Sequence, residues 1–521
     1  MRTPAPALWL LAACCSAGTT SAGSSGGATT GAGASSAGVS GTAGTTGRAG
    51  GASATGGSGS GSAGGSSGGA GPSSSTGGSA GSRSTSSGGT TGAPPAHVAL
   101  FAHYGDGYSP KDPPLDPADA GAWIDWSECG ASVCAALRDA GVHTYWYTDF
   151  VQVGASDYVA RNAYPCDFAH GCDPACTGCD PSTCSASSTC SAACAADEIT
   201  SSGGAYHLMD ARSPHLATLW DQEVAANPAV DAGAYDAVFA DDMPLPYGVA
   251  LACGADAGNW ARAEAAVLAS LPHPVVFNGA ISFPYPSPAY YDAGALSPYA
   301  VADYAPPNVV GARGEECYGA GGATCDDAGL IDSRCQSPGS DPEPGLFVWQ
   351  QTENTELWVA RNHQVLICME DNRGLPECSP RQRLYYIASF LLTYAPPWTV
   401  AAPLWGWQGS FPYLEIFPEE TLVPTEPLVP APEDVAALQR DGGTYAREWA
   451  ACYLRGTPVG PCAIVVNSDC ASHPFPTLSR TYAHTLALSG SGSLFDGAVA
   501  TPDGGPPADP VPELTGLIAL P

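Results

Sequence analysis

The sequence predicts an α/β protein: a closed (β/α)8 barrel of the TIM-barrel type, followed by a small all-β sandwich and preceded by a disordered stalk of Gly, Ser and Thr. Three observations support this prediction. Between His97 and Trp407, apolar strand-like segments alternate with helical ones, which favours a parallel sheet covered by helices. Most of the expected strands end in a carboxylate or an amide. Beyond Glu433, short strands follow one another without helices.

A doubly wound open sheet is the alternative, because it shows the same alternation of strands and helices. Such a sheet usually carries a Gly-rich phosphate loop after its first strand and gathers its ligands at one switch point. No such loop follows the first expected strand, 97–104, and polar residues end strands along the whole region. A closed barrel is therefore favoured.

The elements of the barrel follow from apolar periodicity and from turn residues. Strands are expected at 97–104, 142–149, 205–210, 237–240, 274–279, 309–317, 364–372 and within 398–407. Helices are expected at 133–140, 214–226, 259–271, 353–362 and 381–394. Gly141 ends the first of these helices, because glycine readily takes the left-handed conformation of a helix C-terminus.

The chain divides into four parts by composition. An export signal occupies residues 1–14, a low-complexity linker 15–93, the barrel 94–432 and the sandwich 433–521. A Cys-rich insert near 163–198 lies in the loop after the second expected strand. Strands of the sandwich are expected at 445–454, 462–467, 481–488 and 514–520.

Residues 1–93 carry the signals of an exported, tethered protein. One positive charge and a short apolar core precede the run Leu11-Ala12-Ala13-Cys14, which resembles the lipobox of bacterial lipoproteins. An ordinary secretory signal is the alternative. The linker is almost wholly Gly, Ser, Thr and Ala, and such a segment buries too little apolar surface to fold. We therefore expect an extracellular or bacterial cell-surface protein, with an outer-membrane lipoprotein as one form.

The composition also limits the partners. The net charge is −32 with a single lysine, Lys111, so nucleic acid and anionic lipid would be repelled. The sequence contains no nucleotide, haem or flavin motif. We expect no cofactor and no metal, although acidic strand ends could hold Ca²⁺. We expect a monomer that meets the membrane only through an N-terminal lipid.

The cysteines indicate an oxidising compartment. Of 20 cysteines, eighteen lie between Cys129 and Cys470, and an even number in an exported chain indicates disulfides. We expect Cys452 and Cys462 to pair, because they flank one hairpin within cross-strand reach. The spacing of Cys176 and Cys179, with His170 nearby, leaves structural zinc as the alternative for the insert.

The stretch Tyr235-Asp236-Ala237-Val238-Phe239-Ala240-Asp241-Asp242 is the most informative part of the sequence. Its apolar run lacks polar alternation, which indicates a fully buried strand that ends in two carboxylates. In a parallel barrel the carboxyl ends of the strands line the active-site face, so these acids are placed for chemistry. An acidic loop that caps the next helix is the alternative.

This stretch resembles the fourth strand of glycoside-hydrolase barrels that carry a C-terminal β-sandwich, a group that includes polygalactosaminidase-like enzymes. Arg447-Glu448-Trp449 and the run 463–467 resemble the sandwich hairpin of the same group. The chain departs from the pattern by having Ala237 where Gly is usual, and by its Cys-rich insert. The resemblance implies a carbohydrate substrate and hydrolysis of O-glycosyl bonds, with Asp241 as nucleophile or base.

Glycoside hydrolysis generally needs one acid and one carboxylate nucleophile or base. Asp241 takes the second role, with Asp242 as its substitute. Glu315 or Glu316 is the candidate acid, because a second acid beside it would raise its pKa, and Glu370 and Asp371 are its rivals. The remaining candidates would bind sugar hydroxyls or stack on sugar rings, and they are Asp149, Asp210, Asn278, Trp405 and Trp407.

Two further interpretations stay open at this point. The chain could be a surface adhesin or carbohydrate-binding protein on a barrel scaffold without a catalytic pair, since a fold does not fix a function. It could also be a disulfide-rich structural protein of the envelope. Two carboxylates that face one site at catalytic spacing would separate an enzyme from both.

We predict that the mature chain begins with a lipid-modified Cys14. Mass spectrometry of the N-terminal peptide, from a bacterial host that processes lipoproteins, measures this directly. The variant Cys14→Ser should move the protein from the membrane fraction to the soluble fraction. A free α-amine on any residue other than Cys14 would contradict the prediction.

Overall fold

The structure, a computed structural model, describes most of the chain from Pro95 onward. The described residues are 95–104, 116–201, 206–231, 233–241, 252–255, 257–278, 307–314, 317–318, 343–371, 380–405, 416–440, 443–469, 471–489, 494 and 497–521.

Eight parallel strands form one sheet that closes on itself. In sheet order they are β1 Phe101–Tyr104, β2 Trp126–Cys129, β3 His143–Asp149, β7 Ala237–Asp241, β8 Val275–Asn278, β9 Val309–Gly314, β10 Val365–Asp371 and β11 Thr399–Trp405. The first and last strands meet where Leu100 pairs with Ala401, whose N–H donates to the carbonyl of Ala99 at 2.9 Å. The predicted barrel is confirmed.

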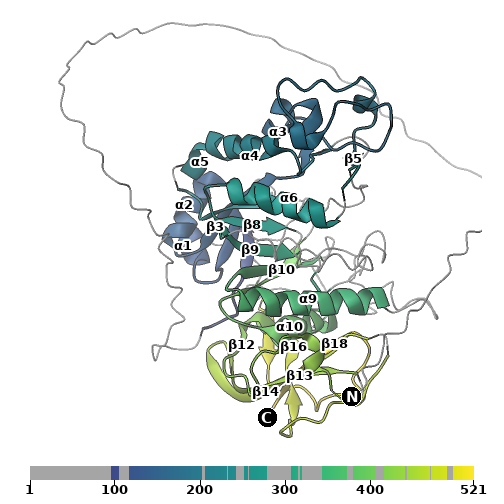
Figure 1. Cartoon of the computed structure of the whole chain (residues 1–521). Helices are drawn as coiled ribbons and strands as arrows, with labels where there is room; N and C mark the ends of the chain where they lie inside the picture. Colours follow the sequence, from purple (N-terminus) through teal and green to yellow (C-terminus); the bar gives the residue numbers. More distant parts are fainter. Residues whose placement is uncertain are drawn as a thin grey trace, which may run out of the picture. The chain divides into compact units, whose positions relative to one another are not determined.

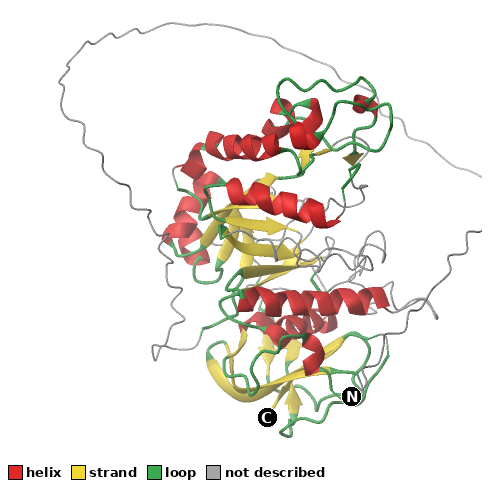
Figure 2. Ribbon diagram, in the orientation of Figure 1, coloured by secondary structure: helices red, strands yellow, loops and turns green. Residues whose placement is uncertain are grey.

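Helices lie on the outside of the strands (Figures 1 and 2). The longer ones are α2 Ala131–Asp139, α4 Pro214–Ala226, α6 Ala257–Ser270, α9 Glu343–Arg361 and α10 Pro380–Thr393, and the short ones are α1 Pro117–Ala120, α3 Tyr158–Asn162 and α5 Pro228–Asp231. Helix α4 begins as its sequence predicts, because the Ser213 hydroxyl accepts from the N–H of His215 and Pro214 fits the first turn. No helix in the described part of the chain is long and apolar enough to cross a membrane.

Side chains alternate between the inside of the barrel and the helix layer. In β3, Tyr145 and Tyr147 join the inner apolar cluster, whereas Trp146 packs with the outer one. The inner cluster also contains Phe101, Trp126, Phe239, Val276, Ile367 and Val400. Alternation of this kind turns every second side chain of β3 and β7 toward the axis of the barrel.

The sequence prediction missed one strand of the barrel and wrongly assigned another. Strand β2 was not expected, because its four residues include Ser127 and Glu128 and lack an apolar run. The segment 205–210 was expected as a barrel strand but is not one. It contains β6 Tyr206–Leu208, which pairs antiparallel with β4 Gln152–Gly154 and β5 Thr200–Ser201 in a separate sheet. The two errors compensate in number, so β7 remains the fourth strand of the barrel.

The Cys-rich insert follows β3, in the loop where the sequence placed it. It contains three short 3-10 helices, η1 Pro165–Asp167, η2 Pro181–Thr183 and η3 Cys194–Ala196. Its disulfides are Cys166–Cys184, Cys176–Cys194, Cys179–Cys190 and Cys172–Cys253. The last of these ties the insert to the loop after β7, and the Cys253 N–H donates to the carbonyl of His170 at 2.8 Å.

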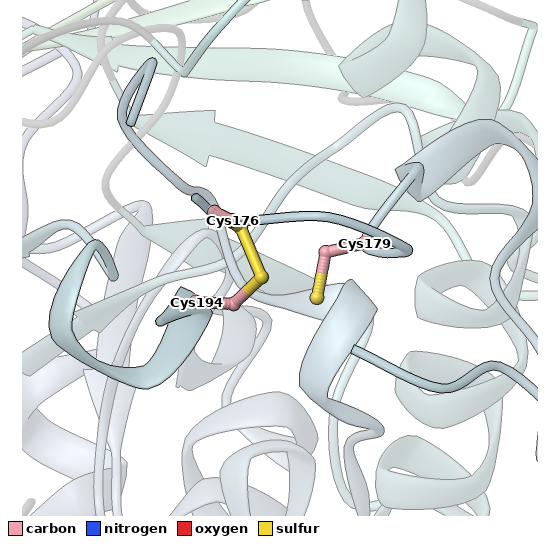
Figure 3. A group of neighbouring side chains, drawn as sticks. All are labelled: Cys176, Cys179 and Cys194. Carbon is pink, nitrogen blue, oxygen red and sulfur yellow. A yellow bond between two sulfur atoms is a disulfide. The ribbon is translucent and has the colours of Figure 1, made fainter. Parts of the chain in front are cut away.

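The alternative of a zinc site in the insert does not agree with these pairs. The sulfurs of Cys176, Cys179 and Cys194 lie within 4.8 Å of one another, a spacing that could suit a metal ion. However, Cys176 is bonded to Cys194, as Figure 3 shows, and Cys179 is bonded to Cys190. Cysteines in disulfides offer no thiolate to zinc.

The C-terminal unit is all-β, as predicted. One antiparallel sheet contains, in sheet order, β12 Leu422–Pro424, β13 Tyr445–Leu454, β14 Thr457–Asn467, β18 Thr515–Leu520 and β15 His484–Thr485, and a second one pairs β16 Ala487–Ser489 with β17 Val499–Thr501. The predicted bridge between Cys452 and Cys462 is present. Two further disulfides, Cys129–Cys134 and Cys317–Cys368, belong to the barrel. Strand β12 joins this sheet although it precedes Glu433, where the sequence suggested that the unit begins.

Helices α9 and α10 lie between the barrel strands and the C-terminal sheet (Figure 1). Gly516 of β18 permits the close approach of α10, since a Cβ atom there would lie 2.4 Å from the carbonyl oxygen of Leu384. Arg447 of β13 is buried, stacks 4.4 Å from the Trp449 ring and donates to the carbonyls of Leu392 and Tyr394 at 3.1 and 3.4 Å. One arginine thus satisfies the C-terminal end of a barrel helix from the neighbouring sheet.

We predict that Arg447→Gln lowers the free energy of unfolding by about 3 kcal/mol, because charged hydrogen bonds to two buried carbonyls are lost. Urea unfolding at neutral pH measures the change. Arg480→Gln, at an exposed position of the same unit, is the control and should stay within about 0.5 kcal/mol of the parent. A change below about 1 kcal/mol for Arg447→Gln would mean that this contact does not join the two units.

Candidate active site

Asp241 ends β7 and is held from both sides by neighbouring strands. Its Oδ2 accepts from the Tyr147 hydroxyl at 2.5 Å, and its Oδ1 accepts from the side-chain amide of Asn278 at 2.6 Å. Tyr147 belongs to β3 and Asn278 to β8, the two strands that flank β7. Both bonds fix the orientation of the carboxylate at the carboxyl end of the barrel.

Asp149 lies beside Asp241 because β3 and β7 run parallel with these two residues in register. The same Tyr147 hydroxyl that contacts Asp241 lies 2.8 Å from Oδ1 of Asp149. Burial raises the pKa of Asp149 to about 7, and the charges of Asp241 and Asp157 act in the same direction, whereas the bond from Tyr147 opposes them. Asp149 is therefore a carboxyl group that holds its proton near neutral pH.

A buried ion pair lies in the interior of the same barrel. Arg313 of β9 donates to Oε2 of Glu128 at 3.1 Å, and both side chains are at most 5% exposed. The guanidinium lies 4.9 Å from the ring centre of Phe239, whose neighbour in the inner cluster is Tyr145. Burial raises the pKa of the Tyr145 hydroxyl well above its ordinary value, and the charges of Arg313, Glu128 and Asp241 also act on this pKa. The ion pair therefore lies in the same interior as the Asp241 carboxylate.

Two more acids lie around Asp149 and were not expected from the sequence. Burial raises the pKa of Glu223 of α4 to about 7, and the charges of Asp157 and Asp149 add to the effect. Asp157 precedes α3, and its Oδ2 accepts from the Gly154 N–H at 2.5 Å. Four acids thus share the region at the end of β3, which keeps protons bound there at neutral pH.

Apart from Asp210, the predicted site residues fall into three groups. Asp149, Asn278 and Asp241 come together as described. The backbones of Glu370, Asp371 and Trp405 end β10 and β11, where Asp371 pairs with Trp405. Asp242, Glu315, Glu316 and Trp407 lie outside the described residues.

Asp210 lies in the insert region. It follows β6, is 1% exposed and binds Arg212 through two bonds of 2.8 and 2.6 Å. Together with Cys253 and residues of the Cys-rich insert, they line a cavity of about 550 Å³. The sequence placed Asp210 at a barrel strand end because the strand that contains Tyr206–Leu208 resembles one locally.

Glu128, Arg313 and Tyr147 were not identified as site residues from the sequence. Arg313 could have been identified from the sequence, because a cation within an apolar strand indicates a buried acid on another strand. Tyr147 carried a weaker signal, because it lies two residues before Asp149 and so shares its face of β3.

Comparisons with known proteins give structural neighbours only. No family model matches the chain, and no curated protein matches it. Among solved structures, the glycoside hydrolase domain of PelA from Pseudomonas aeruginosa is 13% identical, with 58% of this chain and 94% of that chain covered and a TM-score of 0.33. Ega3 of Aspergillus fumigatus, in complex with galactosamine, is 8% identical, with 54% and 80% covered and a TM-score of 0.27. An α-amylase from Malbranchea cinnamomea is 11% identical, with 81% and 96% covered and a TM-score of 0.37.

The likeness to these neighbours is low both in sequence identity and in TM-score. The barrel is established instead by the pairing of its own eight strands. Its site offers one carboxylate that is held by two donors and one carboxyl group that keeps a proton near pH 7. Such a pair is suited to general acid and base chemistry.

We predict a pH-dependent effect of Asp149→Asn on stability. The unfolded chain releases the Asp149 proton near pH 4, whereas the folded chain keeps it to about pH 7. The contribution of this proton to stability is therefore complete below about pH 4 and is lost as the pH rises to about 7. Between pH 5 and pH 8, the parent should lose roughly 2 kcal/mol of unfolding free energy relative to the variant.

Denaturant unfolding of both proteins at the two pH values measures this difference. Asp139→Asn, which changes an exposed acid of α2, is the control and should follow the parent at both pH values. A constant difference between the parent and Asp149→Asn would show that Asp149 is ionised in the folded protein throughout this range.

Proposed function

We propose that the protein is an extracellular glycoside hydrolase that cleaves a poly- or oligosaccharide by two-carboxylate catalysis at the carboxyl end of the barrel. The observation that supports this most is the contact of one phenol, Tyr147, with the carboxyl groups of both Asp149 and Asp241. The disulfides support the extracellular location, because such bonds persist in oxidising compartments.

Asp241 acts as the nucleophile or base. Its two hydrogen bonds, from the Tyr147 hydroxyl and the Asn278 amide, orient it. As a nucleophile, a carboxylate oxygen of Asp241 attacks the anomeric carbon, and as a base it activates a water. In both roles its negative charge stabilises the oxocarbenium-like transition state. Arg313 adds a positive charge to the interior of the barrel, and Glu128 balances that charge.

The acid must carry a proton at the working pH. Among the described groups near Asp241, Asp149 meets this condition. Glu315 and Glu316, which follow β9, remain candidates from the sequence. Oδ1 of Asp149 and Oδ2 of Asp241 both contact the Tyr147 hydroxyl, at 2.8 and 2.5 Å, so the two carboxyl groups lie close together. If Asp149 is the acid, this proximity favours the short spacing of retaining enzymes, roughly 5 Å, over the longer spacing of inverting ones.

We predict that Asp241→Asn lowers the hydrolysis rate by about 10³-fold or more, since it removes the charge and keeps the size. A screen of hydrolysis across a glycan library supplies the substrate, and initial rates are then compared. The melting temperature should change little. Asp139→Asn is the matched control and should keep the parental rate. A rate for Asp241→Asn within about threefold of the parent would contradict the assignment.

Leaving-group dependence identifies the acid. An activated aryl glycoside needs little protonation, whereas a natural linkage needs an acid. The variant of the true acid, Asp149→Asn or Glu316→Gln, should lose activity mainly on the natural linkage. Glycan binding without hydrolysis by the parent would instead favour a non-catalytic carbohydrate-binding protein.

A further inference from the structure

We propose that Tyr147 is a proton switch between Asp149 and Asp241, which holds Asp241 in its working orientation only while Asp149 carries a proton. The proposal rests on the proposed function, in which Asp241 is the nucleophile or base, and adds a control of that site by pH. Tyr147 is a positioning residue in this scheme, because it acts through Asp241.

The geometry around the phenol leads to this inference. The Tyr147 oxygen lies 2.5 Å from Asp241 and 2.8 Å from Asp149. A phenol has one hydrogen, so it can donate fully to one carboxylate only. The second contact is a hydrogen bond only when the carboxyl group on that side carries a proton and donates it to the phenol oxygen. When one carboxyl group also carries a proton, both contacts of the phenol are hydrogen bonds. When the phenolic hydrogen is the only proton of the three groups, only one contact is.

The second proton belongs to Asp149. Asp241 already accepts from the Asn278 amide on its other oxygen. Asp149 instead faces Asp241 from β7, Asp157 from the start of α3 and Glu223 from α4. All the described charged groups that act on Asp149 are acids, and its burial favours the neutral form further.

The two states differ by one proton. In the first, Asp149 donates to the phenol oxygen, the phenol donates to Asp241, and the three groups carry one negative charge. In the second, Asp149 has released its proton to solvent, and two carboxylates compete for the single phenolic hydrogen. Asp241 then loses part of the bond that orients it and gains a neighbouring negative charge. Because a nucleophile or base depends on its orientation, the reaction slows.

The ring of Tyr147 is fixed while its hydroxyl switches. It is packed against Phe239 at 5.7 Å between ring centres and belongs to the inner cluster of the barrel. Tyr147→Phe therefore keeps the packing and removes only the hydroxyl. Asp149→Asn keeps the size of the side chain and removes the titration. The two variants separate the switch from a purely structural role.

The direct test is an NMR titration of the full chain with ¹³C at the Cζ atom of tyrosine, a nucleus that responds to hydrogen bonding of the phenol. The Tyr147 signal is the one lost in Tyr147→Phe. In the parent it should shift with a midpoint near pH 7, and in Asp149→Asn it should not shift in this range. Asp139→Asn should titrate like the parent. A signal that stays constant from pH 5 to pH 9 in the parent, or one that still titrates in Asp149→Asn, would overturn the proposal.

The rate provides a second test on an activated aryl glycoside of the sugar that the screen identifies, since this substrate needs no acid. The parental kcat/KM should fall about tenfold from pH 6 to pH 8, and in Tyr147→Phe the fall should shrink to less than about twofold. An unchanged pH profile in Tyr147→Phe would overturn the switch. The two proposals can fail separately. If the Tyr147 signal titrates but no glycan is hydrolysed, only the proposed enzymatic function is contradicted. If hydrolysis requires Asp241 but the Tyr147 signal stays constant, only the proton switch is contradicted.

Discussion

The parallel pairing of β3 with β7 is the constraint on which the site depends. Its register sets Asp149 opposite Asp241. Because side chains alternate along a strand, Tyr147 shares the inner face with both acids, and a slip of β3 by one residue would turn Tyr147 and Asp149 outward. The closed barrel maintains this register, since each strand is fixed by two neighbours and the ring is completed at Leu100 and Ala401.

Burial gives these groups their chemical properties. Burial and neighbouring acids raise the pKa of Asp149, whereas two hydrogen-bond donors orient the Asp241 carboxylate. The same constraint explains the Arg313–Glu128 pair, because neither charge could be buried there alone. Burial also raises the pKa of an acid outside the barrel strands, Glu356 of α9, to about 8, and the Thr393 and Tyr318 hydroxyls donate to its carboxyl group. In a chain with a net charge of −32, neutral acids reduce the repulsion that folding would otherwise create.

Local patterns predicted most of the architecture. The apolar run of Ala237–Asp241, the helix Pro214–Ala226 and the hairpin around Cys452 and Cys462 are each specified within a few neighbouring residues, and the structure contains all three. Strand β2 could not be recognised in this way, because the burial of Glu128 depends on Arg313, which is distant in sequence. The segment Tyr206–Leu208 was wrongly assigned to the barrel because it is a true strand with a buried Leu208, and only its pairing with β4 and β5 shows that it belongs to another sheet. In the site, strand ends identified Asp149, Asp241 and Asn278, but the role of Tyr147 depends on a register that no single segment contains.

We propose that Asp241, at the end of β7, is the carboxylate that reacts with the sugar, with Asp149 as a partner acid at the short spacing. Trapping with a 2-deoxy-2-fluoro glycosyl fluoride of the hydrolysed sugar, followed by peptide mapping in a mass spectrometer, tests this most directly. A retaining enzyme should accumulate one glycosyl ester, and we predict that it is carried by Asp241. An ester on a different carboxylate, or hydrolysis with inversion and no trapped ester, would contradict the claim.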